Sequence, residues 1–221
     1  MRPEQLAEFY PVLYHIAWGG SWQSIKENSL LSTKSLLKFY GKRDSEIRTF
    51  TQNRREHWRK IDCPGRPQAV IRDQKPLTDS GLRKALPDNV EPSAWYELIN
   101  SMVFFWPTKK RLKTMISAPA YRKVEHDVLL VDTKKLIELE EPNIRLSHIN
   151  SGSTVYNPQP RDVDLFKRFE DYPFDYSLQK RKRKGAVAEV CVLDKVDRIH
   201  EAVIDTEHGL AKDILESLRV K

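Results

Sequence analysis

Glycine, cysteine and long apolar runs are scarce in this 221-residue chain, and each scarcity excludes a class of protein. Only 8 residues are glycine, and neither GxGxxG nor GxxxxGK[ST] occurs, which argues against Rossmann and P-loop nucleotide binding. GxSxG and HExxH are absent as well, so no serine-hydrolase elbow and no zincin helix is expected. The two cysteines, Cys63 and Cys191, form no CxxC pair, which argues against a disulfide framework or a structural zinc site.

Metal-ligand spacing and membrane-directed segments are also missing. The 6 histidines show no spacing typical of a metal site, so we expect no metal. The N-terminal segment lacks the apolar stretch of a signal peptide, and no run approaches membrane-spanning length. We therefore expect no membrane contact and a reducing, cytoplasmic setting.

The residues that are abundant indicate a folded, basic protein. Hydrophobic residues make up 39% and aromatic residues 10% of the chain, which is ample for a packed core. Lys and Arg number 38 against 31 Asp and Glu, giving a net charge of +7. This balance favours acidic partners such as nucleic acid or phosphorylated small molecules, although many proteins without such partners carry similar charge.

Hydrophobic spacing predicts an alternation of helices and strands along the whole chain. We expect strands at 12–17, 68–74, 102–107, 126–133, 186–194 and 202–205. We expect helices at 2–9, 21–31, 32–40, 45–61, 76–86, 91–101, 111–121, 162–169 and 209–220, with the rest of 142–180 irregular. Since strands occur from start to end, the pattern predicts an α+β fold in a single domain, 1–221, whose sheet uses both ends of the chain.

Two ionisable residues interrupt apolar strands, His15 in the first and Glu189 in a late one. Burying such a group is costly unless it is paired or used. His15 is therefore either a core histidine bonded to a backbone carbonyl or a functional residue. Glu189 is either a strand-edge acid paired with the basic run 180–184 or a catalytic carboxylate. Its strand is apolar on both faces, with Glu189 sharing a face with Val187 and Cys191, which predicts cover on both sides and favours the second reading of Glu189.

An arginine and an aromatic cluster complete the residues of interest. Arg72 lies in the short apolar stretch of VIRDQKPL, where its guanidinium is able to grip a carboxylate or phosphate, or to pair with Asp73. The aromatic rings of FFWP, which include Trp106, are either core residues or a stacking surface for a ligand.

In serial order the chain resembles the ADP-ribosyltransferase fold, and specifically the DarT-type DNA-modifying toxins and their bacterial relatives. The similar segments are LYHIAWGGSWQSIKENSLLST, VFFWPTKKRLKTM, DVLLVDT, HINSGSTVYN and AVAEVCVLDKVDRIHEAVI. Together they cover most of the chain, and the first and last are the most specific. The chain departs from the pattern in two ways: the glycine that precedes LL in the family is replaced at Ser29 or Leu30, and Arg72, Arg54 and Arg55 compete for the middle arginine.

This resemblance implies a split β-sheet core with peripheral helices, with NAD as co-substrate in a cleft between two sheets. It implies that His15 binds a ribose hydroxyl of NAD and that Glu189 binds the nicotinamide ribose and stabilises the cationic transition state. An arginine, for which we favour Arg72, would hold phosphate or the acceptor. Further NAD contacts are implied for the segment that ends at Ser32, for Trp106 near the nicotinamide, and for the loop with Asn150 and Ser151.

The leading hypothesis is therefore an NAD-dependent ADP-ribosyltransferase acting on a nucleic-acid acceptor, DNA or RNA, as a toxin or defence effector with an antitoxin or immunity partner. In this view the basic run 180–184 is a substrate-facing loop. The alternative is a non-catalytic nucleic-acid-binding protein on the same fold, whose basic segments follow phosphates. An accessory interaction protein is a third option, for which the sequence has no positive signal.

Overall fold

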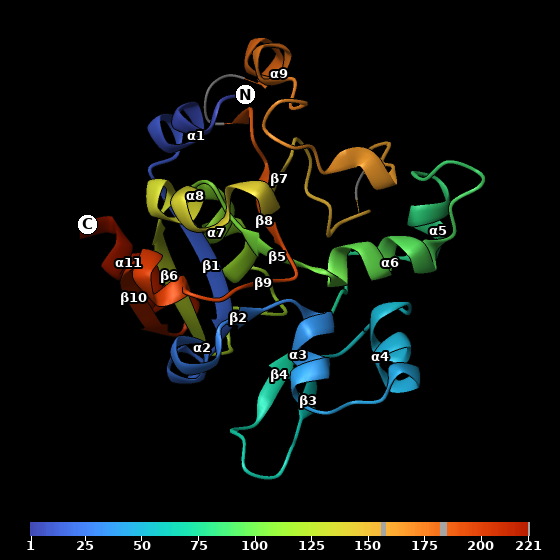
Figure 1. Ribbon diagram of the computed structural model, residues 1–221, viewed down its shortest axis with the longest axis vertical. Helices are drawn as coiled ribbons and strands as arrows, with labels where there is room; N and C mark the ends of the chain where they lie inside the picture. Colours follow the sequence, from blue (N-terminus) through green and yellow to red (C-terminus); the bar gives the residue numbers. More distant parts are fainter. Residues whose placement is uncertain (156–157, 182–184, 221) are drawn as a thin grey trace.

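The computed structural model describes residues 1–155, 158–181 and 185–220 and shows a mixed arrangement of helices and small antiparallel sheets (Figure 1). One sheet has the order β1 (Val12–Trp18), β6 (His126–Asp132), β10 (Val203–Gly209). A second has the order β5 (Met102–Phe105), β8 (Glu189–Leu193), β7 (Ile144–Ser147). Two strand pairs complete the set, β2 (Leu30–Leu31) with β9 (Lys195–Val196) and β3 (Arg59–Ile61) with β4 (Ala69–Ile71). The fold class is thus α+β, as the sequence predicts.

The helices surround these sheets. They are α1 (Pro3–Phe9), α2 (Trp22–Asn28), α3 (Thr33–Phe39), α4 (Asp44–Thr51), α5 (Asp79–Arg83), α6 (Pro92–Asn100), α7 (Lys109–Ile116), α8 (Thr133–Glu140), α9 (Phe174–Arg181), α10 (Ile199–Ala202) and α11 (Ala211–Val220), with 3-10 turns η1 (Glu141–Asn143) and η2 (Val163–Leu165). Over the residues described, no helix combines the length and apolar character needed to cross a membrane.

The two three-stranded sheets meet where β1 passes the end of β5. Tyr14 and Trp106 exchange backbone hydrogen bonds there, with N···O distances of 2.9 Å and 2.8 Å. Strand β1 comes from the N-terminal end of the chain and pairs with β6, which pairs in turn with β10 from the C-terminal end. One sheet therefore contains strands from both ends of the chain, as predicted.

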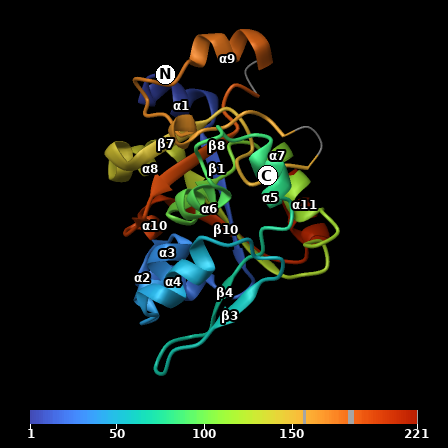
Figure 2. The ribbon, with the colours of Figure 1, turned by 90° about the vertical axis from the view of Figure 1, so that its right-hand side faces the viewer.

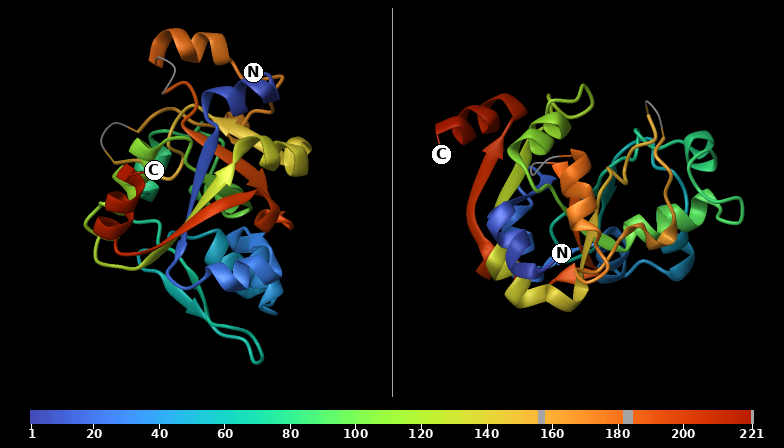
Figure 3. Two further views of the ribbon diagram at one scale, coloured as in Figure 1. Left: turned by 90° about the vertical axis from the view of Figure 1, so that its left-hand side faces the viewer. Right: turned by 90° about the horizontal axis from the view of Figure 1, so that it is seen from above.

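Three apolar clusters separate the layers. Helices α7 and α11 cover one face of the β1 sheet, where Leu112 and Ile214 pack on Val128. The other face of that sheet packs with the second sheet, α1, α8 and α10 in the largest cluster. Helix α6 covers the far face of the second sheet through Trp95 and Ile99. In the view from above, α11 and β10 lie at one side of the molecule and α5 and α6 at the other (Figure 3).

The β3–β4 hairpin projects from the body of the protein (Figures 1 and 2). Its tip contains a tight turn in which Arg66 N–H donates to Cys63 O at 3.1 Å and Gly65 has φ +76°. A type II turn requires a positive φ at its second central position, as Gly65 has, and favours proline at its first, as Pro64 provides. Ile61 and Ile71 anchor the hairpin on Leu37 of α3 and Ile47 of α4.

Several predicted elements differ from the structure. The helix predicted for 45–61 ends at Thr51, because residues 59–61 pair with β4 and tertiary pairing outweighs helical spacing. The helix predicted for 21–31 ends at Asn28, since Ser29 takes φ +79° and Leu30–Leu31 pairs with β9. The helix predicted for 162–169 is a single 3-10 turn, and α8, α9, α10 and β7 were not predicted.

The late strand with Glu189 is buried on both faces, as predicted: Val190 and Val192 join the largest cluster, and Cys191 joins the cluster beneath α6. Val187, predicted to share the face of Cys191, packs instead with Val190, because strand alternation begins only at Glu189. Of the basic run predicted to face substrate, residues 182–184 lie outside the described part of the chain.

Candidate functional site

A cavity of about 340 Å³ opens beside the junction of the two sheets. Four elements supply the predicted residues that line it: His15 from β1, Ser32 before α3, Arg72 after β4 and Trp106 after β5. These residues are up to 91 positions apart in the sequence, and the crossing of β1 and β5 brings them together. The volume lies in the range of small-molecule sites.

His15 presents a neutral imidazole to this cavity. Its Nδ1 donates to Phe104 O at 2.9 Å, so Nε2 keeps a lone pair that is able to accept a hydrogen bond. The pKa of His15 is lowered to about 4, chiefly by burial and also by the nearby Arg72 cation, against the opposing effect of the Phe104 bond. Nδ1 of His15 is thus bonded to a backbone carbonyl, as the core-histidine reading expects. Nε2 is the nitrogen to which the functional reading applies.

Arg72 is held by a second histidine that the sequence analysis did not single out. His126 Nε2 donates to Tyr121 O at 3.0 Å, which leaves Nδ1 to accept from Arg72 Nη2 at 2.6 Å. Arg72 Nη2 also lies 3.4 Å from Ala17 O, and the guanidinium lies 5.4 Å from the Tyr121 ring. Burial and the Arg72 charge lower the pKa of His126 to about 4, which keeps His126 neutral and available as an acceptor.

The remaining N–H groups of Arg72 are not satisfied by the described chain. Its Nε and Nη1 are shielded from solvent and have no hydrogen-bond partner among the described residues. Burial lowers the pKa of this arginine, but arginine stays charged at neutral pH. A buried cation with unpaired N–H groups is costly, and an anion is the kind of ligand that offsets the cost.

The two competing arginines have structural roles. Arg55 is buried, and its guanidinium donates to Arg72 O at 3.0 Å, to Phe50 O and to Asn100 Oδ1 at 2.9 Å. Arg54 pairs with Glu56 and is not part of the cavity wall. Of the three arginines, the structure places only Arg72 in the cavity, and Arg55 fixes the backbone of Arg72.

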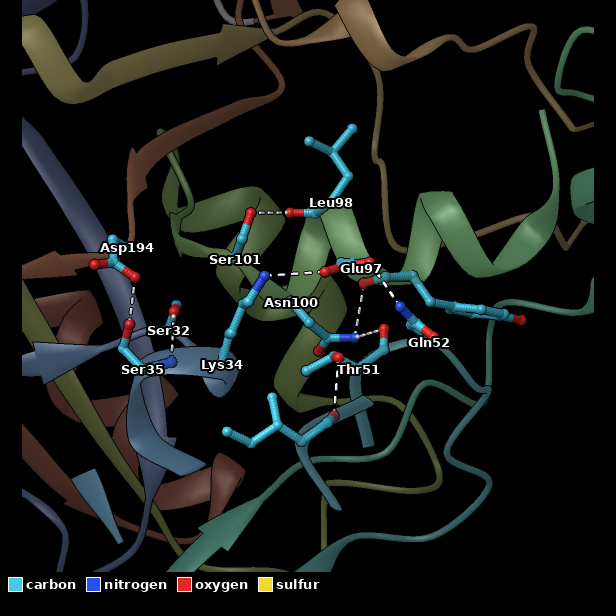
Figure 4. A network of polar contacts seen from close by, with 12 residues as sticks. Ser32, Lys34, Ser35, Thr51, Gln52, Glu97, Leu98, Asn100, Ser101 and Asp194 are labelled. Atoms are coloured by element: carbon cyan, nitrogen blue, oxygen red, sulfur yellow. Dashed lines mark hydrogen bonds and ion pairs between the residues drawn. The ribbon is translucent and has the colours of Figure 1, made fainter. Parts of the chain in front are cut away.

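Ser32 is positioned by a polar network that joins α3, α4, α6 and the end of β8 (Figure 4). Its Oγ caps α3 by accepting from Ser35 N at 3.2 Å, and its N–H donates to Asp194 O at 2.8 Å. Ser35 Oγ donates in turn to the Asp194 carboxylate. Farther along the same network, Lys34 pairs with Glu97 at 2.9 Å, which ties α3 to α6 (Figure 4). Ser32 is therefore a buried helix cap at the edge of the cavity.

Glu189 is not in the cavity wall and forms a second group with the 148–155 loop. Its carboxylate is 2% exposed and accepts from Ser151 N–H, with N···O distances of 3.2 Å and 3.1 Å to its two oxygens. Burial raises the pKa of Glu189 to about 7, although the Ser151 bond and the Arg111 and Arg161 charges act in the opposite direction. The reading of Glu189 as an exposed acid paired with the basic run does not fit this buried position.

Arg161 holds the loop that supplies this hydrogen bond. It is buried, its Nη1 donates to Ser151 O at 3.0 Å and its Nη2 donates to Ser153 O at 2.9 Å. Its guanidinium also lies 5.5 Å from the Trp95 ring. Asn150 is exposed, and its Oδ1 accepts from Gly152 N–H at 3.0 Å. Asn150 and Ser151 therefore lie with Glu189, and not with His15.

The geometry of β5 and β8 relates the two groups. Phe104 lies opposite Cys191 and Phe105 opposite Val190, so one further step of this register puts Trp106 opposite Glu189. Residues opposite one another share a face of the sheet, and so do residues two apart. Phe104 and Trp106 line the cavity, so by this register Glu189 lies one strand away from cavity-lining residues.

His126, Tyr121 and Arg161 were not predicted from the sequence. His126 was visible as a histidine at the start of an apolar strand, but nothing in the sequence indicated its contact with Arg72. Arg161 lies in a polar segment without periodicity and carried no signal. No group of three or more His, Cys, Asp or Glu side chains within the described ranges is arranged to hold a metal ion.

No curated protein matches the chain. A protein-family model described as a family of unknown function (DUF7002) matches residues 11–203, a range that includes the cavity and Glu189. Because the match extends over most of the chain, the protein belongs to this family.

Proposed function

We propose that the protein is an NAD-dependent ADP-ribosyltransferase with an ADP-ribosyltransferase-type split sheet, acting on a nucleic-acid acceptor. The observation that carries the proposal is that His15, Arg72 and Trp106 line one cavity, beside the sheet whose next strand holds Glu189. A neutral hydrogen-bond acceptor is suited to bind a ribose hydroxyl, and a cation with unpaired N–H groups is suited to bind a phosphate. An aromatic ring is suited to pack against a nicotinamide.

Each residue has a role that its own chemistry supports. Nε2 of His15 accepts a hydrogen bond from a ribose hydroxyl, and Arg72 holds a phosphate. In the reaction the bond between the ribose anomeric carbon and nicotinamide breaks, and nicotinamide leaves with the bonding electrons. The acceptor atom forms the new bond and loses a proton. Glu189 stabilises the positive charge on the sugar, as carboxylates do in glycosidases, and its raised pKa suits it to take the proton.

Because Glu189 is separated from the cavity, the proposed reaction requires a structural change on NAD binding. Its carboxylate is buried and bound to Ser151 N–H, and it does not contribute to the cavity wall. NAD binding must therefore open a path between the cavity and Glu189, by movement of the Trp106 side chain or of the 148–155 loop. Activity that depends on Trp106 and on this loop is expected.

A backbone detail also supports the proposal. Ser29 has φ +79° and ψ 159°, a conformation that glycine adopts far more readily than other residues. This is one of the two positions at which the resembling family carries glycine before its leucine pair. Ser29 therefore adopts a glycine-like conformation without being glycine, and the segment leads into the cavity-lining residues Leu30 to Ser32.

The test is transfer of label from NAD. The purified protein is incubated with NAD labelled in its adenylate half, and DNA, RNA and protein pools are separated and counted. Glu189→Gln keeps the size of the side chain and removes its charge, and we expect it to lower transfer at least 100-fold. His15→Ala is expected to raise the apparent KM for NAD, whereas His200→Ala, at an exposed histidine of α10, serves as the control.

Two results would overturn the proposal. The first is the absence of NAD binding and of NAD loss with every pool. The second is undiminished transfer by Glu189→Gln. Salt-sensitive nucleic-acid binding without any loss of NAD would favour the alternative of a non-catalytic nucleic-acid-binding protein.

A further inference from the structure

An exposed tryptophan lies at the base of the β3–β4 hairpin, next to the cavity. Trp58 is 43% exposed, and its ring centroid lies 4.9 Å from that of Trp18, with the two planes tilted by 44°. Trp18 itself lines the cavity. The two rings therefore extend the cavity wall outward onto the surface of the hairpin.

The hairpin register shows which residues share the face of Trp58. Lys60 lies opposite Val70 and Arg59 opposite Ile71, so one further step puts Trp58 opposite Arg72. By strand alternation Trp58 and Lys60 share a face with Val70 and Arg72, both of which line the cavity. This face, called here the Trp58 face, leads from Arg72 in the cavity to Lys60 at the surface.

The Trp58 face is not required to anchor the hairpin. Ile61 and Ile71 hold the hairpin on α3 and α4, and Tyr40 Oη donates to Pro67 O at 2.6 Å. An isolated two-stranded hairpin is marginally stable, so these contacts fix its position. The solvent exposure of Trp58 thus has no evident role in the fold.

The surface around Trp58 is positively charged. Arg59 and Lys60 are exposed and form no ion pair with any residue in the described ranges. The nearby acids have partners of their own: Glu56 pairs with Arg54 at 2.6 Å, Asp62 accepts from the Gln68 side chain at 2.7 Å, and Asp73 accepts from Tyr121 Oη at 3.0 Å. Lys60, which shares the face of Trp58, is therefore available to a negatively charged partner.

We propose that the Trp58 face binds single-stranded nucleic acid, with an unpaired base stacked on Trp58 and an adjoining phosphate on Lys60. An exposed aromatic ring with a cation on the same face fits this ligand, because base stacking and phosphate neutralisation are its two main sources of affinity. A paired base is covered on both faces by its neighbours in the duplex and is not available to stack. The identification of this strand as the acceptor of ADP-ribose rests on the function proposed above.

The experiment measures binding of fluorescent 12-nucleotide single-stranded DNA and RNA, and of their duplexes, by anisotropy without NAD. Trp58→Ala is expected to weaken single-strand binding by about 5- to 150-fold, the loss typical of one stacked base. Trp58→Phe keeps a ring and is expected to restore most of the affinity. Lys60→Ala is expected to lower the slope of log K against log salt by about 0.7, whereas Lys212→Ala on α11 leaves it unchanged.

The outcomes separate the two proposals. Binding of Trp58→Ala equal to wild type, or duplex binding as tight as single-strand binding, overturns the Trp58 face. If Trp58→Ala loses oligonucleotide binding and transfer but still binds NAD in calorimetry, both proposals are supported. If binding depends on Trp58 while no NAD is ever consumed, the Trp58 face stands and the transferase proposal fails. Transfer retained by Trp58→Ala supports the transferase and refutes the Trp58 face as its acceptor site.

Discussion

The burial of Glu189 predicts a pH-dependent stability that is independent of any activity. The carboxyl is 2% exposed, and its pKa is raised from 4.5 to about 7 chiefly by burial. The folded state therefore holds the proton more tightly than the unfolded state does. Between pH 4.5 and 7 the unfolded chain is ionised first, so this group makes the free energy of unfolding fall as pH rises, and the effect levels off above pH 7.

The perturbation is Glu189→Gln, which keeps the shape of the side chain and an oxygen for Ser151 N–H. One pKa unit corresponds to about 1.4 kcal/mol, so the rise in pKa corresponds to about 3 kcal/mol between acid and alkaline pH. The free energy of unfolding of Glu189→Gln minus that of wild type is expected to increase by about 2–3 kcal/mol from pH 5 to pH 8. The titrations of His15 and His126 are common to both proteins and cancel.

Urea unfolding followed by tryptophan fluorescence at pH 5, 6, 7 and 8 measures this difference. Glu216→Gln, at an exposed glutamate of α11, is the control and is expected to give a constant difference. A change below about 0.5 kcal/mol for Glu189→Gln would refute the reasoning, because it would mean that Glu189 is solvated or permanently paired with Arg111 or Arg161.

Three further substitutions test the architecture by the same unfolding measurement. A Cβ at Gly81 would lie 2.5 Å from Thr154 Oγ1, so Gly81→Ala is expected to destabilise by about 1–3 kcal/mol; no loss would show that this approach is looser. Ser29→Gly relieves the φ of +79° and is expected to stabilise by up to about 1 kcal/mol, net of its bond to Asp197. Arg55→Met leaves Arg72 O and Asn100 without their donor and is expected to cost about 3 kcal/mol or more, whereas an unchanged midpoint would contradict its structural role.

The strongly apolar strands were predictable because their burial follows from the apolar residues within each segment. The segments 126–133 and 186–194 are apolar on both faces, and the structure buries β6 and β8 accordingly. Amphipathic helices with clear caps, such as α3 after Ser32 and α6 with Pro92 in its first turn, were also predictable. Residues 59–61 were not, because their pairing with β4 is decided across a turn and outweighs local helical spacing.

The candidate site was only partly predictable for the same reason. His15 and Glu189 stand out in sequence because an ionisable group in an apolar strand is locally anomalous. For the choice among Arg54, Arg55 and Arg72 the apolar stretch around Arg72 was the only local signal, and the outcome depends on which guanidinium meets backbone carbonyls and which reaches the cavity. The contact between His126 and Arg72 joins residues 54 positions apart and is invisible in the sequence.

The sequence by itself therefore determined the α+β class, the apolar strands and the two ionisable residues within them, because these depend on composition and spacing over a few neighbours. Only the tertiary structure decided that His15, Arg72 and Trp106 share one cavity, that Glu189 is bound to Ser151 N–H one strand away, and that Trp58 is exposed beside Trp18. The physical reason is that strand pairing and sheet packing bring residues far apart in the chain into contact, and those contacts set burial, hydrogen bonding and pKa.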